Sequence, residues 1–208
     1  MLDRRGELER AGFDYSALAD MLRTAARFDL ELYVFIPPSH AGQAEVVRFL
    51  GLKPLFRQWL RELACVVAST DSDGTAAHLW DFSGYNSVTT EAIPPFGSKE
   101  RMQWYQDSVH FSRRTGRAIV DTVLGFPPSE LGKDQTFGVQ VTPANIDEYF
   151  EHRRIDRERY LAANPEIEAE IATLYQGKTV PRVQPDALAG LPKPCAATLT
   201  AGEAMTDE

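Results

Sequence analysis

The stretch LELYVFIPP, residues 30–38, is almost continuously apolar, rich in β-forming residues and closed by a double proline. A run of this kind predicts a strand that is buried on both faces of a parallel sheet. A second run, AAHLWDF at residues 76–82, predicts another such strand. Between the two runs, Pro54 opens a stretch whose apolar residues recur at helical spacing. Strands that alternate with helices indicate an α/β fold.

Further helices are predicted around these strands. Apolar residues recur at helical spacing over residues 15–28 and 115–123, and a short helix is predicted at 43–50. The sequence ACVVAS, residues 64–69, either continues the helix that Pro54 opens or forms a strand. Ser98 is a candidate cap of a short helix that leads to Trp104.

The composition changes after residue 126. A heavily charged helix is predicted after Thr142 and Pro143, and a second helical piece is predicted after Asn164 and Pro165. From residue 177 the chain is rich in Pro, Ala, Gly and Thr. We therefore divide the chain into an α/β part at 1–126, a charged helical extension at 127–176 and a flexible tail at 177–208.

The two predicted strands are too few for a stable parallel sheet. Further strands must come from upstream sequence absent here, from a second subunit, or from segments whose pattern is misleading. We favour upstream sequence.

The charge balance excludes several classes of partner. The 208 residues include 22 Lys and Arg against 30 Asp and Glu, a formal net charge of −8. This balance argues against binding to nucleic acid and against adhesion to an anionic membrane surface. No apolar run approaches the roughly 18 residues that span a bilayer, and residues 1–14 lack the apolar core of a signal peptide. As written, the chain is expected in the cytoplasm.

The sharpest local motif is Asp107-Ser-Val-His110, in a connector just before a predicted helix. A carboxylate three residues before a histidine can accept a hydrogen bond from one ring nitrogen and leave the other free as a general base. The same spacing also occurs by chance in solvated loops, so the motif alone does not decide a function.

The order of elements over residues 15–125 resembles the C-terminal half of SGNH/GDSL-type hydrolases. Three patches in order carry the resemblance: FIPP.H at 35–40, WDFSG.N at 80–86 and WY.D..H at 104–110. It implies an incomplete flavodoxin-like, three-layer α/β/α fold with a C-terminal helical extension. It also implies that Asp107 and His110 are the acid and base of a Ser-His-Asp triad.

The chain departs from the family in its nucleophile. No Gly-Asp-Ser block follows a strand before residue 30, and Gly84-Tyr85-Asn86 follows a later strand than the family's GxN block does. We therefore assign no oxyanion role to Asn86. Both this departure and the missing strands point to absent upstream sequence, and the chain as written is expected to be inactive.

Other residues near the motif offer alternatives. His40, Trp104 and Tyr105 are candidate substrate-binding residues, although the two aromatic side chains equally suit packing. Five serines could replace the missing nucleophile, each with a loop role as the simpler interpretation: Ser39, Ser83, Ser87, Ser108 and Ser112. A metal site formed by His40, Asp81 and His110 is a weaker hypothesis, because no spaced histidine motif supports it. We expect no metal or organic cofactor.

The charged helix alternates basic and acidic residues. Its basic members are Arg153, Arg154, Arg157 and Arg159. Interleaved Asp and Glu largely cancel them, which predicts an exposed face of salt bridges.

These observations favour an esterase or acyltransferase lineage that acts on an O-acyl ester of a carbohydrate or lipid. The alternatives are a non-catalytic binding module of the same descent and a truncated remnant. If an N-terminal segment is missing, the protein is expected to be periplasmic or membrane-anchored.

Overall fold

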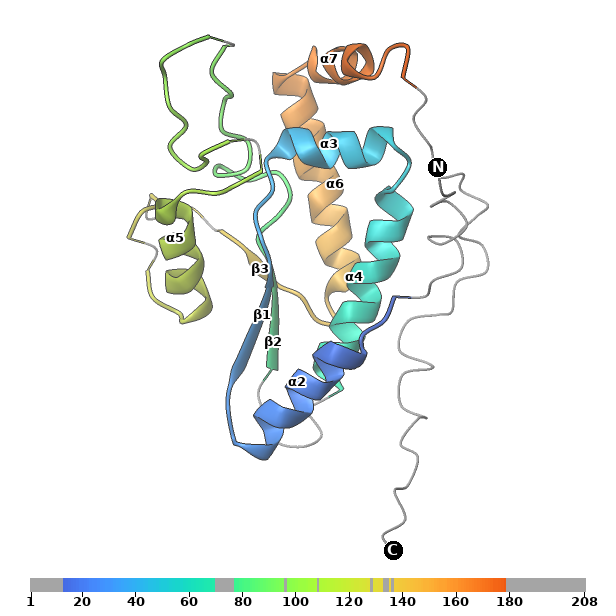
Figure 1. Ribbon diagram of the computed structural model, residues 1–208, viewed down its shortest axis with the longest axis vertical. Coiled ribbons are helices and arrows are strands. Elements are labelled where there is room, and N and C mark those ends of the chain that lie inside the picture. Colours follow the sequence, from blue (N-terminus) through green and yellow to red (C-terminus); the bar gives the residue numbers. More distant parts are fainter. Residues whose placement is uncertain are drawn as a thin grey trace, which may run out of the picture.

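The computed structural model describes residues 13–69, 77–95, 97–107, 109–127, 129–132, 135 and 137–178. Over these residues the chain is α/β, with six helices and a three-stranded mixed sheet that does not close into a barrel. The predicted α/β class is therefore confirmed. Figure 1 shows the sheet in the middle of the molecule, with helices on either side.

The sheet is built on the two predicted strands. β1 (Leu32–Ile36) pairs in parallel with β2 (Ala77–Asp81) along their whole length. The sequence analysis missed β3 (Val139–Gln140), which pairs antiparallel with the end of β2. The strand order is β1-β2-β3, so β1 is an edge strand within the described part of the chain.

The expectation that both strands are buried on both faces is wrong for β1. Every residue of β1 is at least partly accessible, and the Phe35 side chain is 43% exposed. The physical reason is that β1 pairs on one side only among the described residues. The open edge leaves a row of main-chain hydrogen-bonding groups without a partner strand.

The observed helices lie where the sequence predicts them, but the short helix predicted after Ser98 is absent from the described residues. Ser98 caps no helix, because the amides of Gln103 and Trp104 donate to the carboxylate of Glu91 instead. ACVVAS continues a helix. The six helices are α2 (Ser16–Arg27), α3 (Ala41–Phe49), α4 (Lys53–Ala68), α5 (Arg113–Val123), α6 (Ile146–Ala163) and α7 (Ile167–Leu174).

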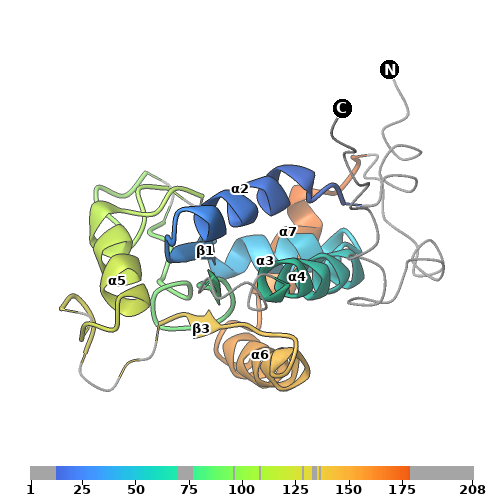
Figure 2. The same cartoon turned by 90° about the horizontal axis from the view of Figure 1, so that it is seen from below.

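Two apolar cores lie on opposite faces of the sheet, because neighbouring residues of a strand point to opposite sides. Leu79 faces the first core, which holds buried side chains of α4 and α6. Trp80 and Phe82 face the second, which holds Ala118 and Ile119 of α5. Figures 1 and 2 show α5 on one side of the strands and α4 and α6 on the other.

The predicted C-terminal extension contributes to the first core. Ile146, Tyr149 and Phe150 of α6 are buried there with Leu60 of α4. Of the predicted tail at 177–208, only residues 177 and 178 are among those described. None of the described helices is long and apolar enough to cross a membrane.

Candidate functional site

Asp107 and His110 lie at the tip of a tight hairpin at 104–112, of which residues 104–107 and 109–112 are described. The Gln106 amide donates to the His110 carbonyl at 2.8 Å, and the Ser112 amide donates to the Trp104 carbonyl at 2.8 Å. These bonds close the loop, so the two side chains are held on the same short turn.

The side chains of the motif are hydrogen-bonded to each other. Asp107 Oδ2 lies 2.8 Å from His110 Nδ1. Asp107 Oδ1 accepts from the amides of Val109 and His110, each at 2.8 Å. A carboxylate fixed in this way makes Nδ1 the protonated nitrogen of the neutral ring and leaves the Nε2 lone pair free.

The electrostatics of the pair favour an ionised carboxylate. The His110 amide, the His110 ring and the Val109 amide together lower the pKa of Asp107 to about 2. The His110 side chain is 74% exposed, so its Nε2 is accessible to a reactant. The geometry thus provides an oriented imidazole whose Nε2 can accept a proton and return it.

The hairpin is anchored to the carboxyl end of β1. The buried Tyr105 hydroxyl donates to the Pro38 carbonyl at 3.3 Å, and the Tyr105 ring meets the His40 ring edge-on at 5.6 Å. Burial, followed by the charge of Glu91, raises the pKa of the Tyr105 phenol. Ligands of open α/β sheets bind outside the carboxyl ends of strands, which is where this anchor places the Asp107–His110 pair.

His40 is a buried helix cap. Its Nδ1 accepts from the Gly42 amide at 3.1 Å, and its Nε2 lies 2.7 Å from the Glu91 carbonyl oxygen. The first contact makes Nδ1 an acceptor, so Nε2 carries the proton and donates to Glu91. Both nitrogens are therefore used by the main chain, and the predicted contact of His40 with substrate stays a prediction.

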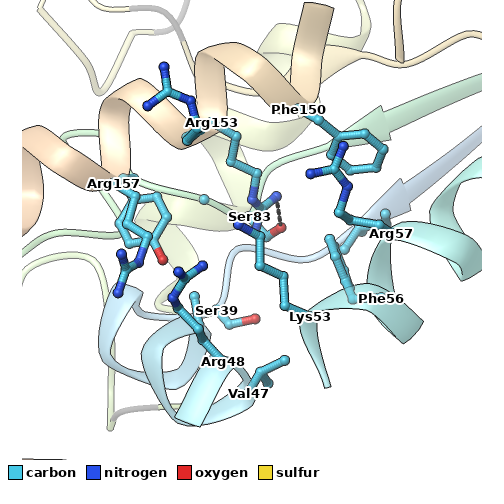
Figure 3. Close-up of a pocket in the computed structure, with 15 residues that line it drawn as sticks. Ser39, Val47, Arg48, Lys53, Phe56, Arg57, Ser83, Phe150, Arg153 and Arg157 are labelled. Carbon is cyan, nitrogen blue, oxygen red and sulfur yellow. Dashed lines mark hydrogen bonds between the residues drawn. The ribbon is translucent and has the colours of Figure 1, made fainter. Parts of the chain in front are cut away.

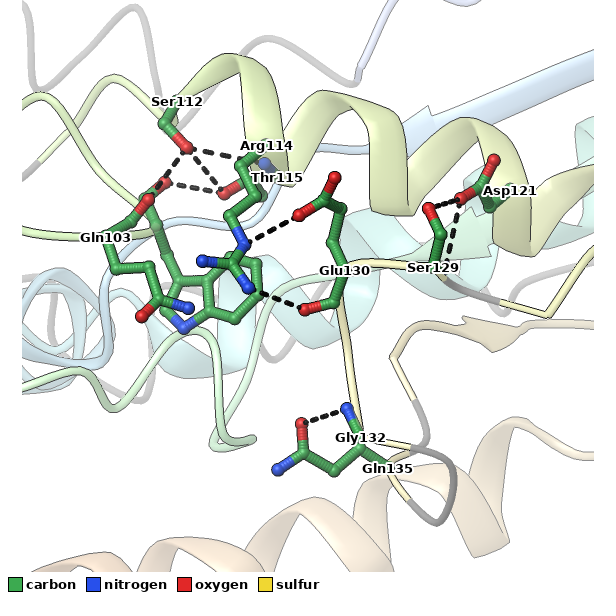
Figure 4. A network of polar contacts seen from close by, with 10 residues as sticks. Gln103, Ser112, Arg114, Thr115, Asp121, Ser129, Glu130, Gly132 and Gln135 are labelled. Carbon is green, nitrogen blue, oxygen red and sulfur yellow. Dashed lines mark hydrogen bonds and ion pairs between the residues drawn. The ribbon is translucent and has the colours of Figure 1, made fainter.

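Helix α5 supports the hairpin from the other side. Ser112 caps α5, and the Thr115 hydroxyl donates to the Trp104 carbonyl at 2.6 Å. The Arg114 guanidinium lies over the Trp104 ring and forms an ion pair with Glu130 at 2.9 Å, as Figure 4 shows for Arg114 and Glu130. Trp104 is thus buried beneath Arg114, and its side chain packs into the second core.

None of the four candidate serines that the structure describes is brought to His110. Among the described residues, no serine hydroxyl is bonded to the His110 ring. Ser112 Oγ donates to the Gln103 carbonyl, and Ser83 Oγ accepts from Arg153. Ser39 lies in a different pocket and Ser87 is exposed, while Ser108 is outside the described residues.

Asn86 and Asp81 have structural partners. Asn86 Oδ1 accepts from the amides of Val88 and Thr89, each at 3.0 Å, which stabilises the turn after β2. The Asp81 carboxylate is bound by Tyr149 and Arg153. No group of three His, Cys, Asp or Glu side chains that could hold a metal is present among the described residues.

The expectation that α6 presents an exposed face of salt bridges is wrong for two of its arginines. Arg153 lies 3.0 Å from the fully buried carboxylate of Asp81, and Arg157 lies 2.6 Å from that of Glu45. The two arginine side chains are only 17% and 12% exposed. Sequence reasoning missed these pairs, although an acidic residue that ends a buried strand is itself a signal that a cation is needed nearby.

Comparisons of the chain with models of protein families, with curated proteins and with solved structures found no match.

Proposed function

We propose that Asp107 and His110 are the acid and base of an ester-hydrolysing or acyl-transferring site of the SGNH/GDSL type. The single observation that carries the proposal is the 2.8 Å contact between Asp107 Oδ2 and His110 Nδ1, with Nε2 exposed. In this role His110 removes the proton of a serine hydroxyl as the serine attacks an acyl carbon, and then gives it to the leaving alcohol.

Asp107 has a positioning role in this reaction. Its carboxylate is ionised at neutral pH because its pKa is held at about 2, first by the His110 amide. The negative charge stabilises the imidazolium that forms when His110 takes the proton, and the hydrogen bond keeps Nε2 turned outward. Proton transfer of this kind contributes about 10²–10⁴-fold to rate.

The serine is proposed to come from a segment that pairs with the open edge of β1. That edge is unpaired within the described residues, and the hairpin carrying His110 is anchored at Pro38, just beyond the end of the strand. A parallel strand added here would end beside the anchored hairpin. The resulting sheet would belong to the flavodoxin-like, three-layer class that the sequence resemblance implies.

The substrate class is an O-acyl ester, on a carbohydrate or a lipid, and the proposed steps use no metal or organic cofactor. Trp104 and Tyr105 are buried, so we assign them the task of fixing the hairpin. We propose that they contact substrate only through the parts of their side chains that stay accessible once the serine-bearing segment has paired with β1.

The test uses the protein purified from the cells that make it. A fluorophosphonate probe, followed by peptide mass spectrometry, reports whether a serine is activated, and hydrolysis of p-nitrophenyl acetate reports turnover. We expect one labelled serine, and a loss of about 10²-fold or more in hydrolysis on His110→Ala. Asp107→Asn is expected to fall in between.

His152→Ala is the matched control. His152 is also an exposed histidine near a carboxylate, with its Nε2 4.0 Å from Glu148, but it lies on α6. Its removal should leave hydrolysis unchanged. Equal activity of His110→Ala and His152→Ala would overturn the proposal. So would the absence of a labelled serine, and the chain would then be assigned to a non-catalytic binding module.

A further inference from the structure

A cationic pocket lies where β1 and β2 end and where α3, α4 and α6 meet. It is a partly open hollow lined by residues at or just beyond the ends of these elements. Its wall carries six of the chain's 22 lysines and arginines and no acidic residue, although the chain as a whole has a net charge of −8. The six are Arg48, Lys53, Arg57, Arg153, Arg154 and Arg157.

Carboxylates outside the wall neutralise the three arginines of α6. Arg153 pairs with Asp81, and Arg157 makes two hydrogen bonds to Glu45, at 2.8 and 2.6 Å. Arg154 pairs with two acidic neighbours on its own helix. These pairs hold the α6 side of the pocket in place.

The three basic residues of α3 and α4 lack such direct pairing, although the charges of Asp147 and Glu151 favour the cationic form of Arg57 from a longer distance. Within the described ranges, no carboxylate lies at ion-pair distance from Arg48, Lys53 or Arg57. Arg57 lies instead over the Phe150 ring, at 4.4 Å from its centroid. Figure 3 shows Arg48 and Lys53 extending toward the α6 side of the pocket.

The positive charges crowd one another. Burial first, and then the charges of Arg48, Arg57, Arg157 and Arg153, lower the pKa of Lys53. Like charges held together in a partly buried space are unfavourable unless an anion shares the space. Arg and Lys are also the side chains that bind carboxylate and phosphate groups in proteins.

The rest of the wall is largely apolar. Ile36, Val47, Phe56 and Phe150 line the pocket between the charged groups. A bare inorganic ion would leave this surface in contact with water. An anion joined to an apolar body would cover it and gain the free energy of burial.

We propose that this pocket binds an organic oxyanion, a carboxylate or phosphate monoester joined to an apolar body. The oxyanion lies between Arg48, Lys53 and Arg57, and the apolar body packs against Val47 and Phe56. This inference does not rest on the proposed hydrolase function, because no residue of the hairpin at 104–112 lines the pocket.

The test is a calorimetric titration of the full chain with four probes, the two amphiphilic anions being kept below their critical micelle concentrations. Octanoate and octyl phosphate carry both features, octanol lacks the charge, and inorganic phosphate lacks the apolar body. We expect saturable binding of at least one octyl anion, at least tenfold tighter than octanol or inorganic phosphate. The tighter of the two anions identifies the head group.

The decisive variant is the double replacement Arg48→Met and Lys53→Met. It removes two charges and keeps the apolar stems, and neither side chain holds an ion pair in the described structure, so the fold should persist by circular dichroism. We expect binding to weaken at least tenfold. Lys99→Met, an exposed lysine outside the pocket, is the matched control and should bind as the parent does.

Either of two results would overturn the inference: equal affinity in the double variant and in Lys99→Met, or octanol binding as tightly as the anions. His110→Ala separates this inference from the proposed function. It should leave octyl-anion binding unchanged while it lowers hydrolysis about 10²-fold or more, so failure of one proposal is distinguishable from failure of the other.

Discussion

Replacement of Gly138 by alanine should destabilise the fold through one identifiable contact. Gly138 has a φ of +81°, and a Cβ built on it would lie 2.4 Å from Cε1 of the fully buried Phe82. The left-handed backbone costs alanine about 1–2 kcal/mol. Forcing a methyl group into a packed ring adds about 1–3 kcal/mol. We expect a total loss of about 2–5 kcal/mol in the free energy of unfolding.

Comparison with Gly125→Ala separates the cost of the packing clash from the cost of the backbone conformation. Gly125 has a φ of +72° but no atom within 4 Å of its built Cβ, so alanine there has the backbone cost alone. Urea denaturation of both variants, followed by circular dichroism, gives the difference. With a slope of about 2 kcal/mol/M, a difference of about 2 kcal/mol lowers the midpoint of Gly138→Ala by a further 1 M or so.

A double-mutant cycle with Phe82→Leu completes the experiment. Removing the ring edge should relieve the clash, so the two substitutions together should cost less than the sum of their separate effects by about 0.5–3 kcal/mol. If Gly138→Ala costs no more than Gly125→Ala, and the cycle shows no coupling, then the packing of Phe82 against residue 138 described here is refuted.

Two further predictions concern charged pairs. Arg153→Met leaves the Asp81 carboxylate buried without its cation and should lower the free energy of unfolding by about 3–5 kcal/mol in urea denaturation. Arg154→Met, at a more exposed site, should lower it by less than about 1 kcal/mol. Equal losses in the two variants would contradict the burial of Asp81. The Asp107 carboxyl should titrate near pH 2 by carbon NMR, so its favourable contribution to stability is present above about pH 4 and is lost as the pH falls toward 2. His110→Ala removes the ring contact and should move this titration upward but not fully to the ordinary value, since amide donors remain; an unchanged titration would show that the ring contributes nothing.

The sequence predicts the elements with long patterns and misses those without one. The apolar runs at 30–38 and 76–82 are long enough to identify β1 and β2. The two residues of β3 carry no pattern of their own, and their pairing depends on the end of β2. The wrong helix after Ser98 has a similar origin, because the carboxylate that binds its amides belongs to Glu91, far from the helical signal.

The candidate sites show the same contrast between local patterns, which the sequence reveals, and tertiary contacts, which it does not. The spacing of Asp107 and His110 predicts their hydrogen bond, since both partners lie on one turn. The cationic pocket was not predicted, because it depends on which residues of α6 face α3 and α4. Alternating charges along a helix suggest solvent, and only the tertiary fold shows that Arg153 and Arg157 meet buried carboxylates.

The pairing of Asp81 with Arg153 also affects the order in which the chain folds during its synthesis. A nascent chain that has left the ribosome as far as β2 already contains both parallel strands and α4, yet the cation that neutralises Asp81 is 72 positions further along. Until α6 emerges, closing the first core would bury a lone carboxylate. The N-terminal elements are therefore expected to stay loosely packed and hydrated until α6 has emerged and Arg153 can pair with Asp81.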